Sequence, residues 1–439
     1  MPDELGGSAG ELLALIECYG PLTRAELGDL AGLPRTTVTG LVTDLIRRSH
    51  VTEQDGIDQE PGTGREHLAL RAGRPPRALI AGGPPAVVGV LSCSRSGIEA
   101  GLVTYPGEIV ARASAAGTAE RATDLSAIAK PGSDLLEALL AEAGCVRDQL
   151  GRVVISLARP VRPGESAVAV TERLGVPVSV QNDANLGSFG EAVHGAGRGH
   201  GSLVYVKLEH NVGVGLVING RLHAGASGFA GELGHVQVRD DGELCACGGR
   251  GCLAAIVGSS LQEFVQRSYE ERLALPQILA LAAEREPAVR RVFVDLGRMA
   301  GRPLASFCTM FDPSAVVLGG SLGVAGQYVL DGIRESIDRH AAPVVASSVV
   351  VIPGELGDRA ELLGGAALAR QLRLAGSRLA PYAASNRTAQ WGAAGRGGAR
   401  RLSAAAPRMG VSRLGVSGLG VSPYYRTPSA RSTGRWERS

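Results

Sequence analysis

Three of the seven cysteines in this 439-residue chain lie close together, at Cys245, Cys247 and Cys252. His235 precedes the first of them by ten residues. Four such sulfur and nitrogen ligands suit a closed, tetrahedral Zn²⁺ site of the structural kind, and the glycines between the cysteines let the backbone turn tightly. Core packing and disulfides are the alternatives. Because the other four cysteines are scattered singly and no export signal opens the chain, we interpret His235, Cys245, Cys247 and Cys252 as zinc ligands.

The predicted metal site overlaps a polar motif, Gly231-Glu-Leu-Gly-His235. A lone histidine is more often a core residue with satisfied hydrogen bonds, but the neighbouring thiols favour a ligand role for His235. The carboxylate of Glu232 stands next to it in the sequence. The segment therefore predicts a ligand pocket that a metal ion braces.

Composition indicates a globular protein with an unusual C-terminal end. At 439 residues the chain is long enough for two or three domains, and 44% of its residues are hydrophobic. No apolar run reaches the roughly 20 residues of a membrane span, so we expect a cytoplasmic protein. From Leu372 onward, twelve arginines face one acid, a net charge of +11 in a chain whose total is +2. We expect residues 372–439 to be a disordered basic tail, which either attracts DNA nonspecifically or has no function.

The N-terminal 50 residues read as three short helices, and the last two are joined by a turn at Gly32. The second helix opens with Thr23-Arg-Ala-Glu26, a capping box. The third, from about Pro34 to Arg48, buries an apolar stripe and leaves arginine and threonine side chains on its free face. This pattern is typical of a helix-turn-helix followed by a wing; the alternative is a plain three-helix bundle. The candidate DNA contacts are Arg35, Thr36, Thr37, Thr39 and Arg47 on the helix and Arg74 on the wing.

From about residue 84 the sequence alternates between β-branched runs and helical stretches, which predicts an α/β architecture. Helices are expected at Asp134–Ala143 and Arg291–Met310. The predicted strands are Val87–Val90, Val153–Ser156, Val178–Val180, Leu203–Leu208, Val214–Ile218, Ala315–Leu318 and Val349–Ile352.

These motifs together resemble the ROK family of repressors, open reading frames and sugar kinases. The resemblance rests on the N-terminal helices with their wing, Asn182-Asp-Ala-Asn185, the Gly231–His235 motif, the cysteine cluster and Leu318-Gly-Gly-Ser321. It implies a winged helix-turn-helix domain followed by two lobes of the actin-like, ribonuclease-H-like fold. The expected divisions are residues 1–80 for DNA binding, 81–200 and 201–371 for the lobes, and 372–439 for the tail. A C-terminal helix, Leu356–Leu368, is expected to return to the first lobe.

The resemblance also implies roles for single residues. In family kinases the aspartate that corresponds to Asp183 is the general base for the sugar hydroxyl, and the residues corresponding to Asn182, Glu232 and His235 hold sugar hydroxyls. A carboxylate within hydrogen-bond reach of a hydroxyl can accept its proton. The alternative for Asp183 is a turn or helix-cap residue, because Asn-Asp-Ala-Asn is good turn chemistry.

The chain departs from the kinase pattern at both phosphate-binding elements. Leu91 stands in place of the metal-binding acid, and Cys93-Ser94 replaces the glycine pair. Glu209 would bring a negative charge to the second phosphate loop, where it repels a triphosphate. The connection that follows Val153–Ser156 is also shorter than the family's sugar-contacting segment.

We therefore expect a transcriptional regulator, a repressor that has lost kinase function and keeps Asp183 as a vestige of the catalytic site. Its expected partners are double-stranded operator DNA, a sugar or sugar-phosphate effector and further copies of the chain in a dimer or tetramer. The alternatives are an ATP-dependent hexose kinase and a regulator that binds DNA constitutively.

Overall fold

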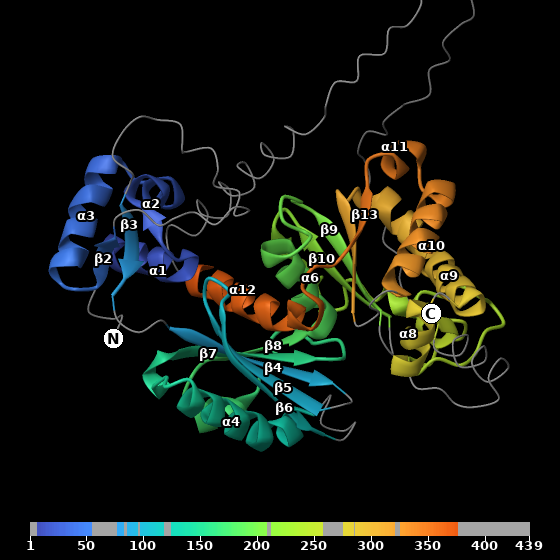
Figure 1. The fold of residues 1–439 in the computed structure, drawn as a ribbon, viewed down its shortest axis with the longest axis horizontal. Coiled ribbons are helices and arrows are strands. Elements are labelled where there is room, and N and C mark those ends of the chain that lie inside the picture. Colours follow the sequence, from blue (N-terminus) through green and yellow to red (C-terminus); the bar gives the residue numbers. More distant parts are fainter. Residues whose placement is uncertain are drawn as a thin grey trace, which may run out of the picture. The chain divides into compact units, whose positions relative to one another are not determined.

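The computed structural model describes residues 7–54, 77–82, 86–94, 97–117, 124–208, 212–257, 275–284, 286–320 and 325–375. The predicted wing residue Arg74, the second phosphate loop with Glu209, and residues 376–439 of the predicted tail lie outside this set. Within it, a small helical segment with its own sheet precedes two five-stranded sheets that are covered by helices (Figure 1). The α/β fold class is confirmed.

The N-terminal segment has three helices and a three-stranded antiparallel sheet of order β1-β3-β2. The capping box at Thr23 is present, since Thr23 N donates to Glu26 Oε2 at 2.8 Å and Glu26 N donates to Thr23 Oγ1 at 3.2 Å. The third helix ends within one residue of its predicted bounds. Strands β2 and β3 flank the segment in which the wing was predicted. The elements are α1 (Ser8–Tyr19), β1 (Leu22–Thr23), α2 (Arg24–Ala31), α3 (Arg35–Arg47), β2 (Val51–Gln54) and β3 (Ala78–Ala81).

The two larger sheets share one topology. In each, three consecutive antiparallel strands are followed by two strands that join in parallel beside the first. The first sheet has the order β6-β5-β4-β7-β8, and the second has the order β11-β10-β9-β12-β13. This repeated arrangement is the two-lobed architecture that the resemblance implied. The strands are β4 (Val87–Ser94), β5 (Gly97–Thr104), β6 (Ile109–Ala116), β7 (Leu150–Leu157), β8 (Val178–Asn182), β9 (Leu203–Leu208), β10 (Val212–Ile218), β11 (Arg221–Leu222), β12 (Ala315–Gly319) and β13 (Val350–Pro353).

Each of these sheets has one face covered by its own helices and the other turned toward α6 and α12. Helices α4 and α5 share a buried cluster with the outer face of the first sheet, and α8, α9 and α10 share one with the second. A third buried cluster joins α6 and α12 to the remaining faces of both sheets and to the N-terminal helices. The helices are α4 (Leu125–Glu142), α5 (Val168–Leu174), α6 (Asp183–His194), α8 (Leu275–Ala283), α9 (Pro287–Phe311), α10 (Ala325–His340), α11 (Pro343–Ala346) and α12 (Ala360–Ala375), with 3-10 turns η3 (Arg147–Gln149), η4 (Leu233–His235) and η5 (Gly357–Arg359).

Some element bounds differ from those the sequence predicted. Helix α4 begins nine residues before the expected Asp134, because Asp124 caps it and Pro131 is accommodated inside it. The C-terminal helix begins at Ala360 rather than Leu356, since a 3-10 turn with Gly357 at φ +56° comes first. It continues to Ala375 instead of ending at Leu368, and so crosses the expected boundary at residue 371.

Helices α6 and α12 lie side by side (Figure 1), and their backbones approach closely at two glycines. A Cβ added at Gly364 of α12 would lie 1.9 Å from the carbonyl oxygen of Leu186, and one at Gly190 of α6 would lie 2.2 Å from that of Ala360. Because the obstructing atoms are backbone, neither helix can yield locally to a larger side chain. The glycines therefore fix the position of α12 against α6.

A matched pair of glycine substitutions tests this crossing. Gly40 in α3 is exposed and has no atom within 4 Å of an added Cβ. We expect Gly40→Ala to raise the free energy of unfolding by up to about 1 kcal/mol through helix propensity. Gly364→Ala should instead lower it by about 1–3 kcal/mol through overpacking. Urea denaturation of both variants measures the difference, and a stabilising Gly364→Ala would show that the crossing is looser than described.

Candidate functional site

The four predicted metal ligands come together. The Nδ1 of His235 and the three thiol sulfurs lie within 4.8 Å of one another. His235 Nδ1 is 3.5 Å from Cys245 Sγ, and Cys247 Sγ is 3.7 Å from Cys252 Sγ. Sulfurs that each bind one tetrahedral ion at the usual zinc–sulfur length stand about 3.8 Å apart. The group therefore has the composition and spacing of a metal-binding site.

Tight backbone turns bring the thiols to one point. Cys245 N donates to Gly249 O at 2.8 Å, which closes a turn that contains Cys247. Gly251 has φ +65°, and a Cβ there would lie 1.6 Å from the carbonyl oxygen of Arg239. Only glycine fits at this position. The shape of the loop thus requires a glycine directly before Cys252, at Gly251.

His235 connects the thiol cluster to Glu232. Its Nδ1 faces Cys245, and its Nε2 is 3.8 Å from Glu232 Oε2. A metal-binding imidazole whose second nitrogen faces a carboxylate is a common arrangement that fixes the orientation of the ring. Burial raises the pKa of Glu232, with a further increase from the charge of Asp183 and an opposing effect of His235. Glu232 therefore lies next to His235 and close enough to Asp183 for their charges to interact.

Asn182 and Asp183 stand at the junction of β8 and α6. Asn182 is the helix cap: its Oδ1 accepts from Asn185 N at 3.0 Å, and its Nδ2 donates to Arg159 O at 3.2 Å and to Asp183 Oδ1 at 3.0 Å. Both ends of its amide are thus engaged within the protein. This geometry makes Asn182 an orienting residue for Asp183. The alternative expected for Asp183 was a helix cap, but the residue that caps α6 is Asn182.

Two charged residues that were not predicted as site residues lie near Asp183: Lys207 contacts it directly, and Glu361 contacts Lys207. Lys207 Nζ of β9 donates to Asp183 Oδ2 at 2.9 Å and to Glu361 Oε1 of α12 at 2.6 Å. Glu361 Oε2 also accepts from Ser92 Oγ at 2.5 Å and from Ser156 Oγ at 2.6 Å. We call these five residues the Lys207 network. It joins β4 and β7 of the first sheet to β9 of the second and to the first turn of α12.

The Lys207 network is well sheltered from solvent. The side chains of Lys207, Asp183 and Glu361 are 12%, 16% and 15% exposed. Burial raises the pKa of Asp183, and the neighbouring charge of Glu361 adds to this while Lys207 opposes it. Burial acts in the same direction on Glu361, but Lys207 and the two serine hydroxyls outweigh it, so the pKa of Glu361 is lowered. Ser92 and Ser156 are thus partners that Glu361 has in addition to the ammonium group it shares with Asp183.

The short connection after β7 packs against the loop that precedes Glu232. Arg159 pairs with Glu165 inside this connection, and a Cβ at Gly228 would lie 2.0 Å from the carbonyl oxygen of Val161. The two loops therefore touch each other, and Arg159 of the first one also accepts the hydrogen bond from Asn182. At the first phosphate element, Leu91 is fully buried in the outer cluster of the first sheet. An apolar side chain in that place offers no ligand to a magnesium ion.

The predicted DNA contacts that the structure describes lie on α3. Arg35, Thr36, Thr37 and Thr39 are exposed there, while Val38, Val42 and Leu45 of the same helix are buried. Arg47 is exposed as well, but it pairs with Asp44 one turn earlier. The exposed face of α3 thus carries the guanidinium of Arg35 and a row of hydroxyl groups.

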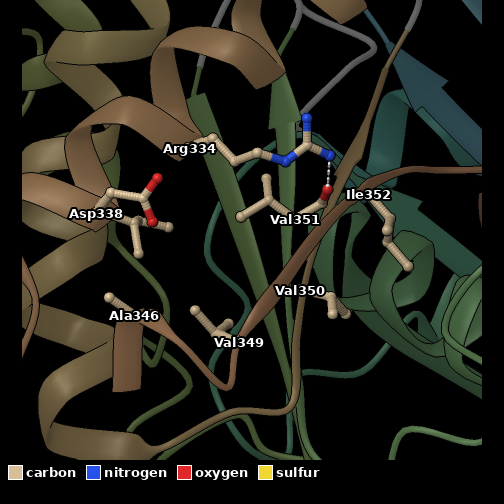
Figure 2. A pocket seen from close by; sticks show the side chains of 8 residues that line it. Arg334, Asp338, Ala346, Val349, Val350, Val351 and Ile352 are labelled. Atoms are coloured by element: carbon tan, nitrogen blue, oxygen red, sulfur yellow. Dashed lines mark hydrogen bonds between the residues drawn. The ribbon is translucent and has the colours of Figure 1, made fainter. Parts of the chain in front are cut away.

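A pocket of about 330 Å³ lies elsewhere, between α10 and the edge strand β13 (Figure 2). Its lining is mostly aliphatic, with Arg334 and Asp338 as the charged members. The guanidinium of Arg334 donates to the carbonyl of Val351 and so occupies a hydrogen-bonding group of the sheet edge. None of the predicted site residues lines this pocket.

Residues 126–372 match the ROK family. Since the match spans more than half of the 439 residues, the chain belongs to this family, as its motifs predicted. It is 26% identical to the xylose repressor of Bacillus subtilis (strain 168) over 349 residues, which are 78% of this chain and 90% of that repressor. It is 33% identical to the glucokinase of Streptomyces coelicolor over 262 residues, 55% of this chain and 83% of that enzyme.

A crystal structure of a ROK family transcriptional regulator, a homologue of the E. coli MLC protein, superposes with a TM-score of 0.66. The alignment covers 87% of this chain and 98% of that one at 22% identity, and supports the same fold. None of the helices in the described residues is long and apolar enough to span a membrane.

The two lysines of the chain offer a matched test of the Lys207 network. Lys207→Met leaves two sheltered carboxylates without their cation, so we expect it to lower the free energy of unfolding by about 3–5 kcal/mol. Lys130, which is 75% exposed and pairs with Asp134, serves as control. Exposed ion pairs contribute little, so Lys130→Met should leave urea denaturation unchanged. Equal effects of the two substitutions would contradict the importance of the network.

Proposed function

We propose that the protein is a DNA-binding transcriptional repressor whose body responds to a sugar and transfers no phosphate. The exposed arginine and threonine face of α3, which precedes a ROK body, carries this proposal. Arg35 is suited to bind a phosphate or a guanine edge, and the hydroxyls of Thr36, Thr37 and Thr39 are suited to the same backbone and base groups. In a dimer or tetramer, paired α3 helices would reach two operator half-sites.

The share of the chain that is aligned with its relatives supports a regulator over a kinase. The relative named a xylose repressor matches 78% of this chain, whereas the relative named a glucokinase matches 55%. The kinase alternative has Asp183 in its favour. Against it, Lys207 already holds the carboxylate that would accept the hydroxyl proton, and Glu361 would repel an incoming phosphate.

The effector that fits this site best is an uncharged sugar. Asp183, Glu361 and Glu232 bring three carboxylates to the region, and Lys207 is the cation that contacts two of them. A sugar phosphate would have to approach a net negative charge. A polyol instead finds hydrogen-bond acceptors for its hydroxyl groups at Asp183 and Glu232. The two loops that meet at Val161 and Gly228 would then close over the sugar.

The metal that fits the thiol cluster is Zn²⁺, with His235, Cys245, Cys247 and Cys252 as a closed set of four ligands. Such a site contributes folding free energy and holds its ligand loop rigid. Here it would fix the imidazole of His235 and, through it, the orientation of Glu232. We therefore assign the metal a structural role beside the sugar site.

DNA binding is tested with operators recovered by genome-wide mapping of binding sites. Arg35→Ala should weaken the affinity for the recovered operator by about 5–150-fold, the loss expected of one phosphate or base contact. Arg298→Ala on α9, far along the chain and paired with Glu335, is the control and should bind like the unchanged protein. Absence of sequence-specific binding, together with ATP-dependent phosphorylation of D-glucose, would favour the kinase alternative instead.

Metal binding is tested by replacing one ligand thiol. Cys247→Ser should abolish stoichiometric zinc in elemental analysis and lower the thermal unfolding temperature, because three ligands hold the ion far less well than four. Cys145 lies outside the cluster and makes one weak contact to Ala143 O, so Cys145→Ser should keep both the zinc and the unfolding temperature. If the unchanged protein contains no zinc and melts like Cys247→Ser, the assignment is wrong.

A further inference from the structure

Helix α12 makes polar contacts at both of its ends with different parts of the protein. Glu361 in its first turn belongs to the Lys207 network. In its last turns, Arg373 pairs with Glu17 of α1, and the guanidinium of Arg370 lies 5.1 Å from the ring centre of Tyr19. A helix of 16 residues is about 24 Å long. One continuous element thus runs from the neighbour of Asp183 to the first N-terminal helix.

We propose that Lys207 and Glu361 are positioning residues that transmit occupancy of the Asp183 site to the N-terminal helices through α12. The inference rests on the proposed function, in which Asp183 binds a sugar hydroxyl and α3 binds DNA. It adds the residues and the path that connect these two events.

The first step is competition for one carboxylate. Asp183 Oδ1 is already occupied by Ala184 N at 2.8 Å and by Asn182, and Oδ2 is occupied by Lys207. A hydroxyl that donates to Asp183 must therefore share Oδ2 with the ammonium group or displace it. Lys207 then interacts more strongly with Glu361, its other carboxylate partner. This changes the electrostatic force on the first turn of α12, which contains Glu361.

The second step requires α12 to move as one body. Ten of the 16 residues of α12 are buried, and its glycines allow it to pack directly against the backbone of α6. Because close-packed elements have few intermediate arrangements, a change of force at Glu361 favours a shift of the whole helix over local bending.

The third step is the contact between α12 and α1. Arg373 is engaged by Glu17 and also stands 5.1 Å from the ring centre of Tyr105, so its guanidinium is held from two sides. Burial lowers the pKa of Arg373, but the charge of Glu17 together with Tyr105 outweighs this and raises it, so the group remains a fixed cation. The buried side of α1, with Leu12, Leu15 and Ile16, belongs to the same cluster as α3. A shift of α12 would therefore reach the proposed recognition helix through α1.

Two variants test the path from its two ends, and one serves as control. Glu361→Gln keeps the size of the side chain and removes its charge. Glu17→Gln does the same at the far end, where the carboxylate is 24% exposed and its loss is tolerated more easily. Glu335→Gln removes a charge of the same type on α10, where it pairs with Arg298. All three are made in the full-length protein.

The first measurement is hydrogen–deuterium exchange without any ligand. Glu361→Gln should speed exchange in α1 at least about threefold, and Glu17→Gln should do the same in the first turn of α12, because each loses a contact at the opposite end. Glu335→Gln should change neither segment. Unchanged exchange in α1 while the first turn of α12 is loosened would overturn the inference. Should Glu361→Gln fail to fold, the exchange of Glu17→Gln decides alone.

The second measurement is the effect of D-xylose and D-glucose on operator affinity. In the unchanged protein and in Glu335→Gln, an active sugar should alter the dissociation constant by about 5-fold or more. In Glu361→Gln and Glu17→Gln the effect should fall below about 2-fold, and Glu17→Gln, which lies at the far end of α12 from Asp183, should retain its sugar affinity within about 3-fold. A full sugar effect in both variants would refute the path. If neither sugar acts on the unchanged protein, the effector part of the proposed function fails for these sugars, and the exchange data still decide the coupling.

Discussion

The two ion pairs of Lys207, with Asp183 and with Glu361, are the interactions on which the region between the two large sheets depends. A carboxylate that leaves water loses several kcal/mol of hydration free energy, and a nearby cation restores it only when the remaining hydrogen-bond positions are also filled. Glu361 meets this condition through Ser92 and Ser156, and Asp183 meets it through Asn182 and the backbone of α6. Both carboxylates can then remain sheltered between two sheets that lie in different parts of the sequence.

The metal group beside this network imposes a different kind of constraint. The bonds from a metal ion to thiolates are short and directional, so a bound ion would fix the loop that carries the cysteines. The ion pairs of Lys207 are strong but can change partners, because an ammonium group has three donors and no preferred plane. Glu232 interacts with both groups, since it lies next to His235 and is influenced by the charge of Asp183. In the proposed repressor, the sugar site would thus have a rigid side at Glu232, which the metal group holds, and an adaptable side at the Lys207 network.

The sequence predicted the metal group and missed the Lys207 network for a physical reason. All four metal ligands lie within 18 residues, so their types and spacing indicate a shared site before any fold is known. Lys207 and Glu361 are 154 residues apart, and Ser92 and Glu361 are 269 apart, so only the folded chain brings them together. The strands rich in valine and isoleucine were predicted, while β5 and β6, which contain several alanines and two glycines, lack the β-branched pattern that identifies a strand. The start of α4 was hidden because proline usually ends a helix, and Pro131 does not.

The position of α12 explains how a kinase-like body can serve a regulator. Glu361 places a charge in the first turn of α12 and connects this helix to Asp183 through Lys207. In the proposed regulator, this negative charge would oppose a triphosphate and so disfavour phosphoryl transfer. The same charge would make α12 sensitive to any group that competes for Asp183. In the proposed function, loss of catalysis and gain of a response to sugar would both follow from one arrangement of charges, because both depend on the contact between Asp183 and Lys207.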